Sequence, residues 1–122
     1  MFSEAILDHF RNPRNAGELA DANATVEVSN PVCGDILKLS ARIVNGHIEE
    51  ARFLCRGCTT AIACASFLTE QIRGRTIAEA RAITAESLSE ALGGLPPATF
   101  HGAQLAGAGV HALLQNRSST CP

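Results

Sequence analysis

The sequence predicts an α+β fold in which a three-stranded antiparallel sheet, a meander, is covered by helices. Two observations support this prediction. Between residues 24 and 56 apolar and polar side chains alternate as they do in half-buried strands, and from residue 59 onward the apolar residues follow helical spacing. Strands that come first and helices that follow favour an antiparallel sheet with helices packed on it over a parallel α/β sheet.

Three strands are expected, at residues 25–30, 35–44 and 47–55. Asn45-Gly46 separates the last two, and Asn-Gly between alternating segments is the strongest short-range signal for a β-hairpin. One face of the middle strand is apolar and needs a cover, because every second residue on it is hydrophobic: Leu37, Leu39, Ala41 and Ile43.

The cover is expected from helices in the rest of the chain. Ser3 is expected to cap a first short helix that stops at Asn12-Pro13, and residues 12–22 are expected to form a loop. Later helices are expected at residues 59–73, from a capping box at residues 76–79, at residues 85–92, and after an extended segment at residues 95–100. The last helix is expected to be weak, since each of its glycines costs roughly 1 kcal/mol relative to alanine: Gly102, Gly107 and Gly109.

Length and charge limit the possible functions. A chain of 122 residues fits one domain, expected at residues 1–116 with a flexible tail at 117–122. Ten Lys and Arg against twelve Asp and Glu, with no long run of either sign, predict binding neither to nucleic acid nor to an anionic membrane surface. No secretory signal or continuous apolar span is recognisable, so the expected location is the cytoplasm.

Five cysteines, at positions 33, 55, 58, 64 and 121, make an odd number in a chain without an export signal. A disulfide framework is therefore the poorer interpretation, and the thiols are expected to be metal ligands, nucleophiles or core residues. Cys33 and Asp35 lie two residues apart in a Pro- and Gly-containing bend between two strands, which offers a soft sulfur ligand beside a carboxylate. Taken alone, a Cys-Gly-Asp sequence of this kind is more often only a turn.

Two further residues occupy positions suited to metal binding. Cys58 directly precedes a helix, where the exposed amides and the helix dipole favour thiolate over thiol. His101 stands where an extended segment meets the final helix, and a neutral imidazole suits zinc or iron. A lone histidine at such a place is more often structural.

The other thiols are expected to be core residues. Cys55 shares strand parity with Phe53, and Cys64 lies in a helix that is apolar nearly all round. Cys55 and Cys58 have Cys-x-x-Cys spacing, but the redox motif expects a βαβ setting that this sequence does not show. His9, His47 and His111 show no spacing that indicates a partner.

Several segments together resemble the iron–sulfur cluster assembly scaffold family, the IscU and NifU N-terminal domain type. The match runs in order from about residue 3 to 114, which is far more specific than any single thiol. The segments are residues 8–15, 30–35, 51–53, 57–58, 61–63, 69–70, Gly74, and Leu95-Pro96-Pro97 before His101.

The resemblance implies a small antiparallel sheet covered by helices, with the ligands clustered at one end. It also implies one site, for both metal and cofactor, formed by Cys33, Asp35, Cys58 and His101. The cofactor implied is a transient Fe–S cluster, expected to be [2Fe–2S], with zinc possible in the protein as isolated. The family's third ligand cysteine is replaced here by Gly102, and Cys121 in the tail is a hypothetical substitute.

The resemblance implies a scaffold or carrier that binds iron and a transient cluster and transfers the cluster to apo-proteins, without being an enzyme. One alternative is a diverged relative whose zinc or iron site serves structure or desulfurase binding. Another is thiol chemistry through Cys55 and Cys58. The expected partners are a cysteine desulfurase and apo-proteins; the altered Leu-Pro-Pro loop argues against a specialised Hsp70 chaperone, and the expected state is a monomer or weak dimer.

Overall fold

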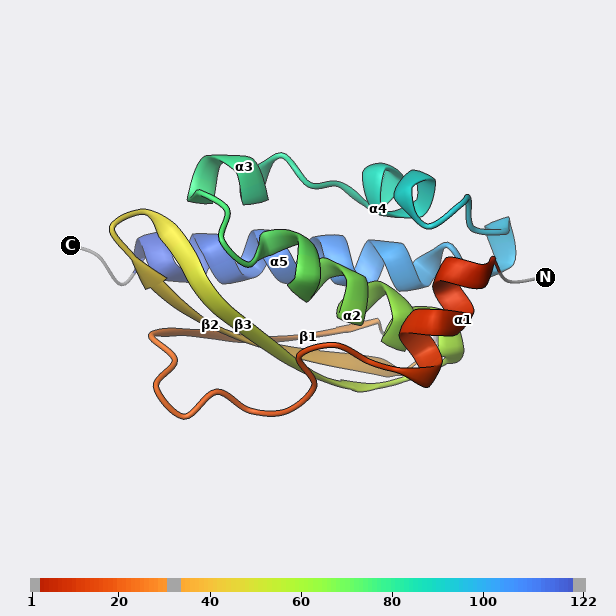
Figure 1. Cartoon of the computed structure of the whole chain (residues 1–122), viewed down its shortest axis with the longest axis horizontal. Helices are drawn as coiled ribbons and strands as arrows, with labels where there is room; N and C mark the ends of the chain where they lie inside the picture. The colour runs from red at the N-terminus through yellow and green to blue at the C-terminus, as the bar shows by residue number, and fades with distance from the viewer. Residues whose placement is uncertain (1–2, 31–33, 120–122) are drawn as a thin grey trace.

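The computed structural model describes residues 3–30 and 34–119, and side chains up to residue 115. A single three-stranded antiparallel sheet has the order β1 (Ala24–Asn30), β2 (Asp35–Val44) and β3 (His47–Arg56). Helices lie on one of its faces, as Figure 1 shows. The α+β meander predicted from the sequence is therefore confirmed.

The strand register follows from the turns. Asn45 and Gly46 both have positive φ, 53° and 77°, which is the geometry that a two-residue hairpin turn with the matching twist requires. On β2 the alternate residues from Leu37 to Ile43 are buried, whereas Ile36, Lys38 and Arg42 remain partly exposed. The predicted apolar face is thus the face that the helices cover.

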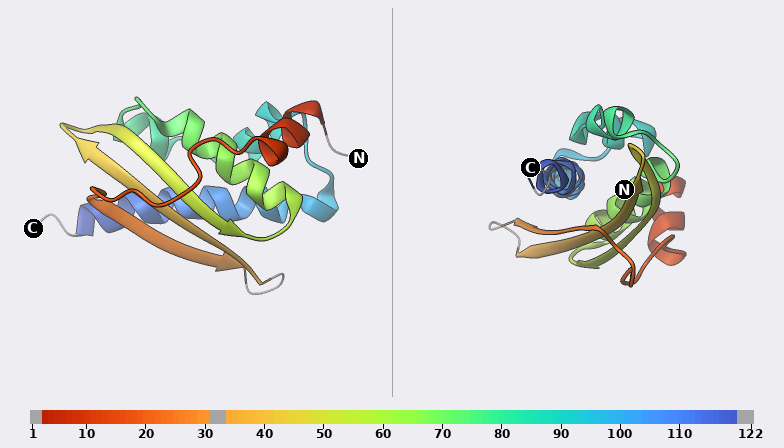
Figure 2. Two further views of the ribbon diagram at one scale, coloured as in Figure 1. Left: turned by 60° about the horizontal axis from the view of Figure 1, so that its bottom comes forward. Right: turned by 90° about the vertical axis from the view of Figure 1, so that its left-hand side faces the viewer.

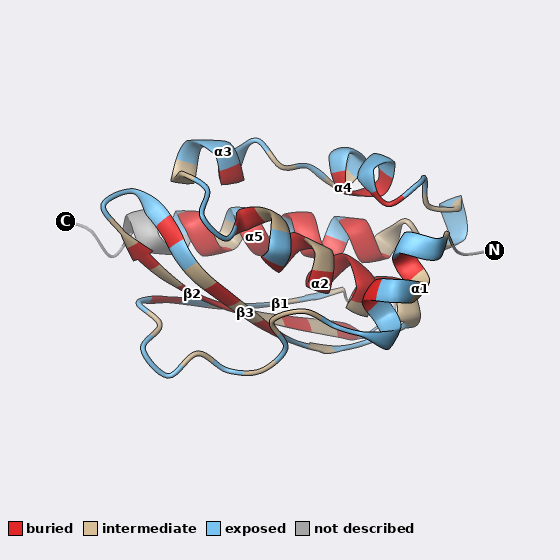
Figure 3. Ribbon diagram, viewed as in Figure 1, coloured by how far each residue is buried: buried red, intermediate tan, exposed pale blue. Residues whose placement is uncertain are grey.

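Two helices lie directly against this face. The helix α2 (Thr59–Ile72) packs on β3, and α5 (His101–Ser119) packs along β1 and β2 and against α2. Both are largely buried in Figure 3, because each has neighbours on several sides. The glycines do not prevent α5 from forming: at Gly102, Gly107 and Gly109 the helix closely approaches other parts of the chain.

Shorter helices complete the fold. The first, α1 (Glu4–Arg11), is capped by the Ser3 hydroxyl, which accepts a hydrogen bond from the Ile6 amide, and it packs on α2. The helices α3 (Ile77–Arg81) and α4 (Ala85–Ala91) each begin with a capping box and lie on the far side of α2 and α5 from the sheet (Figures 1 and 2). None of the helices in the described ranges is both long and apolar enough to cross a bilayer.

The segment before α5 differs from the prediction. Residues 95–100 were expected to be extended, but Pro97–Thr99 form a 3-10 turn, η1. The Thr99 amide donates to the Pro96 carbonyl at 2.9 Å, and the Thr99 hydroxyl also donates to it, at 3.2 Å. Two prolines fix φ in a range that a turn also accepts, so extension was the wrong inference. The domain boundary at residue 116 stays a prediction; α5 runs to Ser119.

Candidate metal centre

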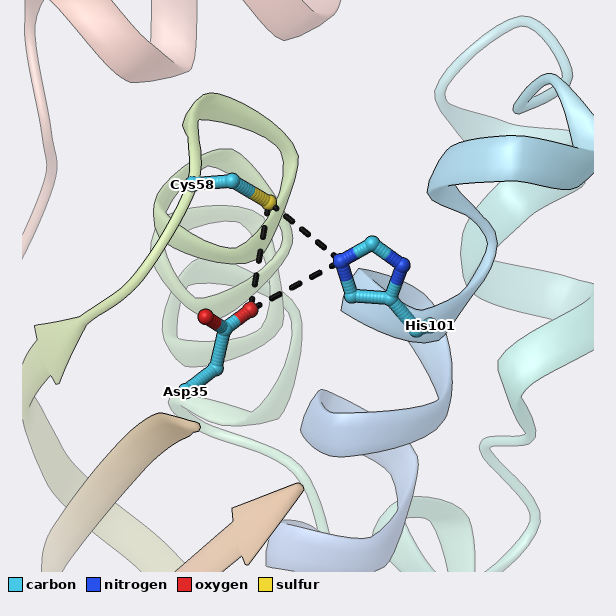
Figure 4. Close-up of side chains that lie close together, drawn as sticks. All are labelled: Asp35, Cys58 and His101. Atoms are coloured by element: carbon cyan, nitrogen blue, oxygen red, sulfur yellow. Dashed lines mark hydrogen bonds and ion pairs between the residues drawn. The ribbon is translucent and has the colours of Figure 1, made fainter. Parts of the chain in front are cut away.

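Three side chains from distant parts of the chain converge at the end of the molecule where α5 begins. Asp35 opens β2, Cys58 is the N-cap residue of α2, and His101 is the first residue of α5. Figure 4 shows the three side chains pointing toward one another. Their ligand atoms all lie within 4.8 Å of one another. Among the described residues, no other group of three or more His, Cys, Asp or Glu side chains is placed to hold a metal ion.

The separations are short enough for one ion to touch all three groups. The Cys58 Sγ lies 3.5 Å from the His101 Nε2 and 3.9 Å from an Asp35 carboxylate oxygen. The His101 Nε2 lies 3.7 Å from the same carboxylate oxygen. Ligands that bind a tetrahedral ion at 2.0–2.3 Å stand roughly 3.3–3.8 Å from each other, so this arrangement needs little adjustment to accept one.

The site combines a buried anchor with an accessible thiol. Asp35 is buried, His101 is partly exposed, and Cys58 is exposed. The Cys58 side chain makes no capping hydrogen bond to the first turn of α2, although residues at this position commonly do. Its sulfur is therefore free of a backbone partner and open to an ion or a partner molecule.

Gly57 allows the carboxylate to reach the site. A Cβ atom at this position would lie 2.8 Å from the Asp35 Cγ and 3.1 Å from each carboxylate oxygen. The Asp35 carboxylate therefore packs directly over the backbone at the junction between β3 and α2. The sequence shows a glycine before Cys58 but gives no sign of this role, because the contact joins residues 22 positions apart in the numbering.

Cys33, predicted as the fourth ligand, lies outside the described residues, and so does Cys121. The chain on either side of residues 31–33 is in place: Asn30 pairs with Asp35, and the Gly34 amide donates to the Asn30 carbonyl at 2.7 Å. The Gly34 φ of 75° is one that glycine adopts without strain. Three of the four predicted site residues are thus brought together, and the assignment of Cys33 stays a prediction.

The remaining described thiols have a different environment. Burial, helped by the charges of Asp35 and Cys58, raises the pKa of Cys55 to about 12. Burial raises the pKa of Cys64 to about 12 as well, and this residue is fully buried in α2. Thiols of this kind carry almost no thiolate at neutral pH, which weakens the interpretation of Cys55 and Cys58 as a redox pair.

A second polar cluster, between α1 and α2, was not anticipated. His9 is buried with its Nδ1 2.8 Å from the Ser66 Oγ, and the Arg14 amide donates to the same hydroxyl at 2.8 Å. The His9 Nε2 lies 3.5 Å from a Glu70 carboxylate oxygen. These contacts arise only when α1 and the loop that follows it pack on α2, so no local sequence signal could have indicated them.

Comparison with known proteins supports the family resemblance over almost the whole chain. The model of the NifU-like N-terminal domain matches residues 1–118. The chain is 44% identical over 106 residues to "Iron-sulfur cluster assembly scaffold protein IscU 1" of Archaeoglobus fulgidus, covering 87% of this chain and 69% of the relative. It is 38% identical over 122 residues to the IscU scaffold protein of Escherichia coli K12, covering 97% and 94% of the two chains.

Solved structures share the fold. A putative iron–sulfur cluster assembly scaffold protein for the SUF system from Fervidobacterium islandicum superposes with a TM-score of 0.78 at 23% identity, covering 93% of this chain and 96% of that one. The N-terminal part of a NifU-like protein from Brucella abortus gives a TM-score of 0.80 at 18% identity, covering 97% and 94%. The sheet, the helices over it and the extent of the sequence match lead to one conclusion: this chain belongs to the NifU-like N-terminal domain family.

Proposed function

We propose that this protein is an iron–sulfur cluster assembly scaffold, which binds iron and a transient cluster and transfers the cluster to apo-proteins. The observation that carries the proposal is the convergence of Asp35, Cys58 and His101 within 4.8 Å at an accessible end of the fold. The high identity to scaffold proteins along most of the chain gives this donor set its functional context.

The chemistry of the donors fits iron, zinc or a small cluster as cargo. A thiolate suits iron in clusters and zinc, an imidazole suits both metals, and a carboxylate completes a mixed set. Cys33 is proposed as the fourth ligand because it stands two residues before Asp35 in the chain. Two thiolates and two harder ligands would fit a [2Fe–2S] cluster that is held weakly enough to be passed on.

Each residue has a distinct role in this proposal. The buried Asp35 provides the carboxylate ligand, and the absence of a side chain at Gly57 leaves room for this carboxylate against the backbone. His101 contributes an imidazole nitrogen from the first residue of α5. Cys58, with its exposed sulfur, is the group that meets incoming iron and sulfide, and the open position of the site permits contact with a cysteine desulfurase and with apo-proteins.

The chain is proposed to act without turning over a substrate of its own, in the cytoplasm, as a monomer or weak dimer. The high pKa of Cys55, about 12, argues against an enzymatic thiol pair with Cys58. The segment before the site reads Leu95-Pro96-Pro97-Ala98-Thr99 and lacks the lysine that usually ends it in the family, so binding of the specialised Hsp70 chaperone is not part of the proposal.

Anaerobic reconstitution tests the proposal. The wild-type protein is incubated with iron, cysteine and a cysteine desulfurase, and visible absorption is recorded with iron, sulfide and zinc analysis. A chromophore with sulfide in stoichiometric amount is expected, at least tenfold weaker in Cys58→Ser and in His101→Ala. The Cys64→Ser variant is the matched control. It also loses one cysteine thiol, but Cys64 is fully buried within α2, whereas Cys58 is exposed at the start of that helix.

The outcome that contradicts the proposal is a colourless wild-type protein that retains zinc. That result would favour the alternative in which the site serves structure or desulfurase binding without cluster assembly. Full colour in Cys58→Ser would instead show that a cluster forms elsewhere in the chain.

A further inference from the structure

Gly102, the second residue of α5, is buried against the first turn of α2. A Cβ atom at this position would lie 2.9 Å from the Thr60 Cγ2, 3.0 Å from the Thr60 carbonyl carbon and 3.0 Å from the Ala61 amide nitrogen. Two of these three atoms are backbone atoms, which cannot move aside without moving the helix. The starts of α2 and α5 therefore approach each other closely at Gly102, and a Cβ atom fits there only if the first turn of α2 shifts.

A second observation shows how tightly this contact is closed. Thr60 is fully buried, and its hydroxyl oxygen has no hydrogen-bond partner among the described residues. Buried hydroxyl groups nearly always have a partner, so an isolated one marks a place where packing has priority over hydrogen bonding. Packing the first turn of α2 against α5 therefore leaves the Thr60 hydroxyl without a hydrogen bond to any described residue.

The same two helix starts carry two of the metal-site residues. Cys58 immediately precedes the first turn of α2, and His101 immediately precedes Gly102. Because both side chains are attached at this contact, the spacing of the helix starts sets the spacing of the ligands. The Cys58 Sγ and the His101 Nε2 are 3.5 Å apart in this arrangement.

We propose that Gly102 is a positioning residue for the metal site: the missing side chain lets α5 close on α2, which holds His101 beside Cys58 before any metal arrives. This inference rests on the site assigned under the proposed function. It gives Gly102 a role that differs from the loss of a ligand. In this chain the position contributes helix contact, and an added Cβ atom is expected to shift the two ligand-bearing helix starts relative to each other.

The test uses the Gly102→Ala variant, which adds only the Cβ atom, and titrates it with Co²⁺ alone. Co²⁺ is suited to the mixed sulfur, nitrogen and oxygen set, and its thiolate charge-transfer and visible bands report on sulfur ligation and coordination geometry. We expect the Co²⁺ dissociation constant to rise at least tenfold and the visible bands to weaken, as water replaces His101.

Gly107→Ala is the matched control. It lies in the same helix and is also buried, and a Cβ there would approach a backbone atom of another helix, the Ala85 nitrogen, at 3.2 Å. This contact is with α4, away from the metal site. A purely structural effect would weaken Co²⁺ binding in both variants in proportion to their loss of thermal stability, whereas the proposal predicts weakened binding in Gly102→Ala alone.

If Gly102→Ala does not fold, the double variant Thr60→Ser/Gly102→Ala is titrated against Thr60→Ser. Serine lacks the Cγ2 that gives the 2.9 Å contact but keeps the two backbone contacts at 3.0 Å, so binding at least threefold weaker than in Thr60→Ser is expected. Binding within twofold of the reference in either comparison overturns the role of Gly102 and leaves the site intact. A wild-type protein without a thiolate-to-cobalt band overturns the site as well.

Discussion

Two glycines beside the proposed metal site matter because they have no side chain. Gly57 leaves room for the Asp35 carboxylate, and Gly102 leaves room for the first turn of α2. Neither has a positive φ, so conformational freedom does not explain them. Close approach by another part of the chain is the other common reason for glycine, and it operates at both positions.

Gly57→Ala is expected to destabilise the fold and to displace Asp35. The added Cβ would stand 2.8 Å from the carboxyl carbon, and overpacking of this kind costs about 1–3 kcal/mol. Denaturant unfolding measures the loss. In an Asp35→Ala background the clash is removed, so the same substitution should cost much less there; an equal cost in both backgrounds would place the strain elsewhere.

The three described cysteines are expected to differ strongly in reactivity. With a pKa of about 12, Cys55 and Cys64 hold about one thiolate in ten thousand molecules at pH 8, whereas the Cys58 sulfur is exposed. Brief treatment of the native protein with iodoacetamide, followed by peptide mass analysis, should show modification of Cys58 and almost none of the other two. Rapid labelling of Cys55 would revive the thiol-pair interpretation.

At the scale of elements, the contact between α1 and α2 contains an ionisable group in its interior. Burial, and to a smaller extent the Arg14 guanidinium, lowers the pKa of His9 below 6.5, while Glu70 and Asp8 oppose this effect. The unfolded chain therefore binds a proton more readily than the folded one. The contribution of His9 is complete above about pH 6.5 and is lost as the pH falls through that value toward the folded-state pKa.

The free energy of unfolding should accordingly fall between pH 7 and pH 5, by no more than about 1.4 kcal/mol per pH unit from this one proton. Denaturant unfolding across this range tests the prediction. His9→Gln cannot titrate and should show a flatter profile. An unchanged slope would assign the pH dependence to other groups.

The elements differ in how far the sequence predicts them. Ser3, Asn45-Gly46 and the capping box at Thr76 are local signals, and the helix and turn they indicate are present where expected. The turn at Pro97–Thr99 was missed, because proline fits both a turn and an extended chain. Alternation along β2 identified the covered face, because alternate residues of a strand point to opposite faces and only one of the two faces is apolar throughout.

The convergence of Asp35, Cys58 and His101 was predictable only through the whole-chain resemblance. Asp35, Cys58 and His101 each have a commoner structural explanation, and no spacing between positions 35, 58 and 101 indicates that they meet. The packing that joins them was not predictable at all: the Gly57 contact, the Gly102 contact and the His9 cluster depend on which helix faces which. The fold class is predicted more directly from the sequence, because the different repeat periods of strands and helices show which segments form the sheet and which form the helices that cover it.

For the molecule as a whole, metal binding should raise stability, because the ligands come from β2, α2 and α5. An ion that binds only the folded state adds about 2.7 kcal/mol at a free concentration one hundred times its dissociation constant. Thermal unfolding with Zn²⁺ and then with excess chelator should show a midpoint that rises by several degrees and returns. Asp35→Ala should respond weakly; an equal response would indicate binding outside the site.

The distance along the chain between the ligands also sets an order in time. During synthesis Asp35 and Cys58 emerge before His101, and α5 is still to be made when all three strands have been synthesised. A nascent chain at that stage carries two of the three groups but lacks the helix that aligns the third. We therefore expect metal binding to become possible only late, when α5 packs on the sheet, and a chain truncated before α5 to lack the third ligand.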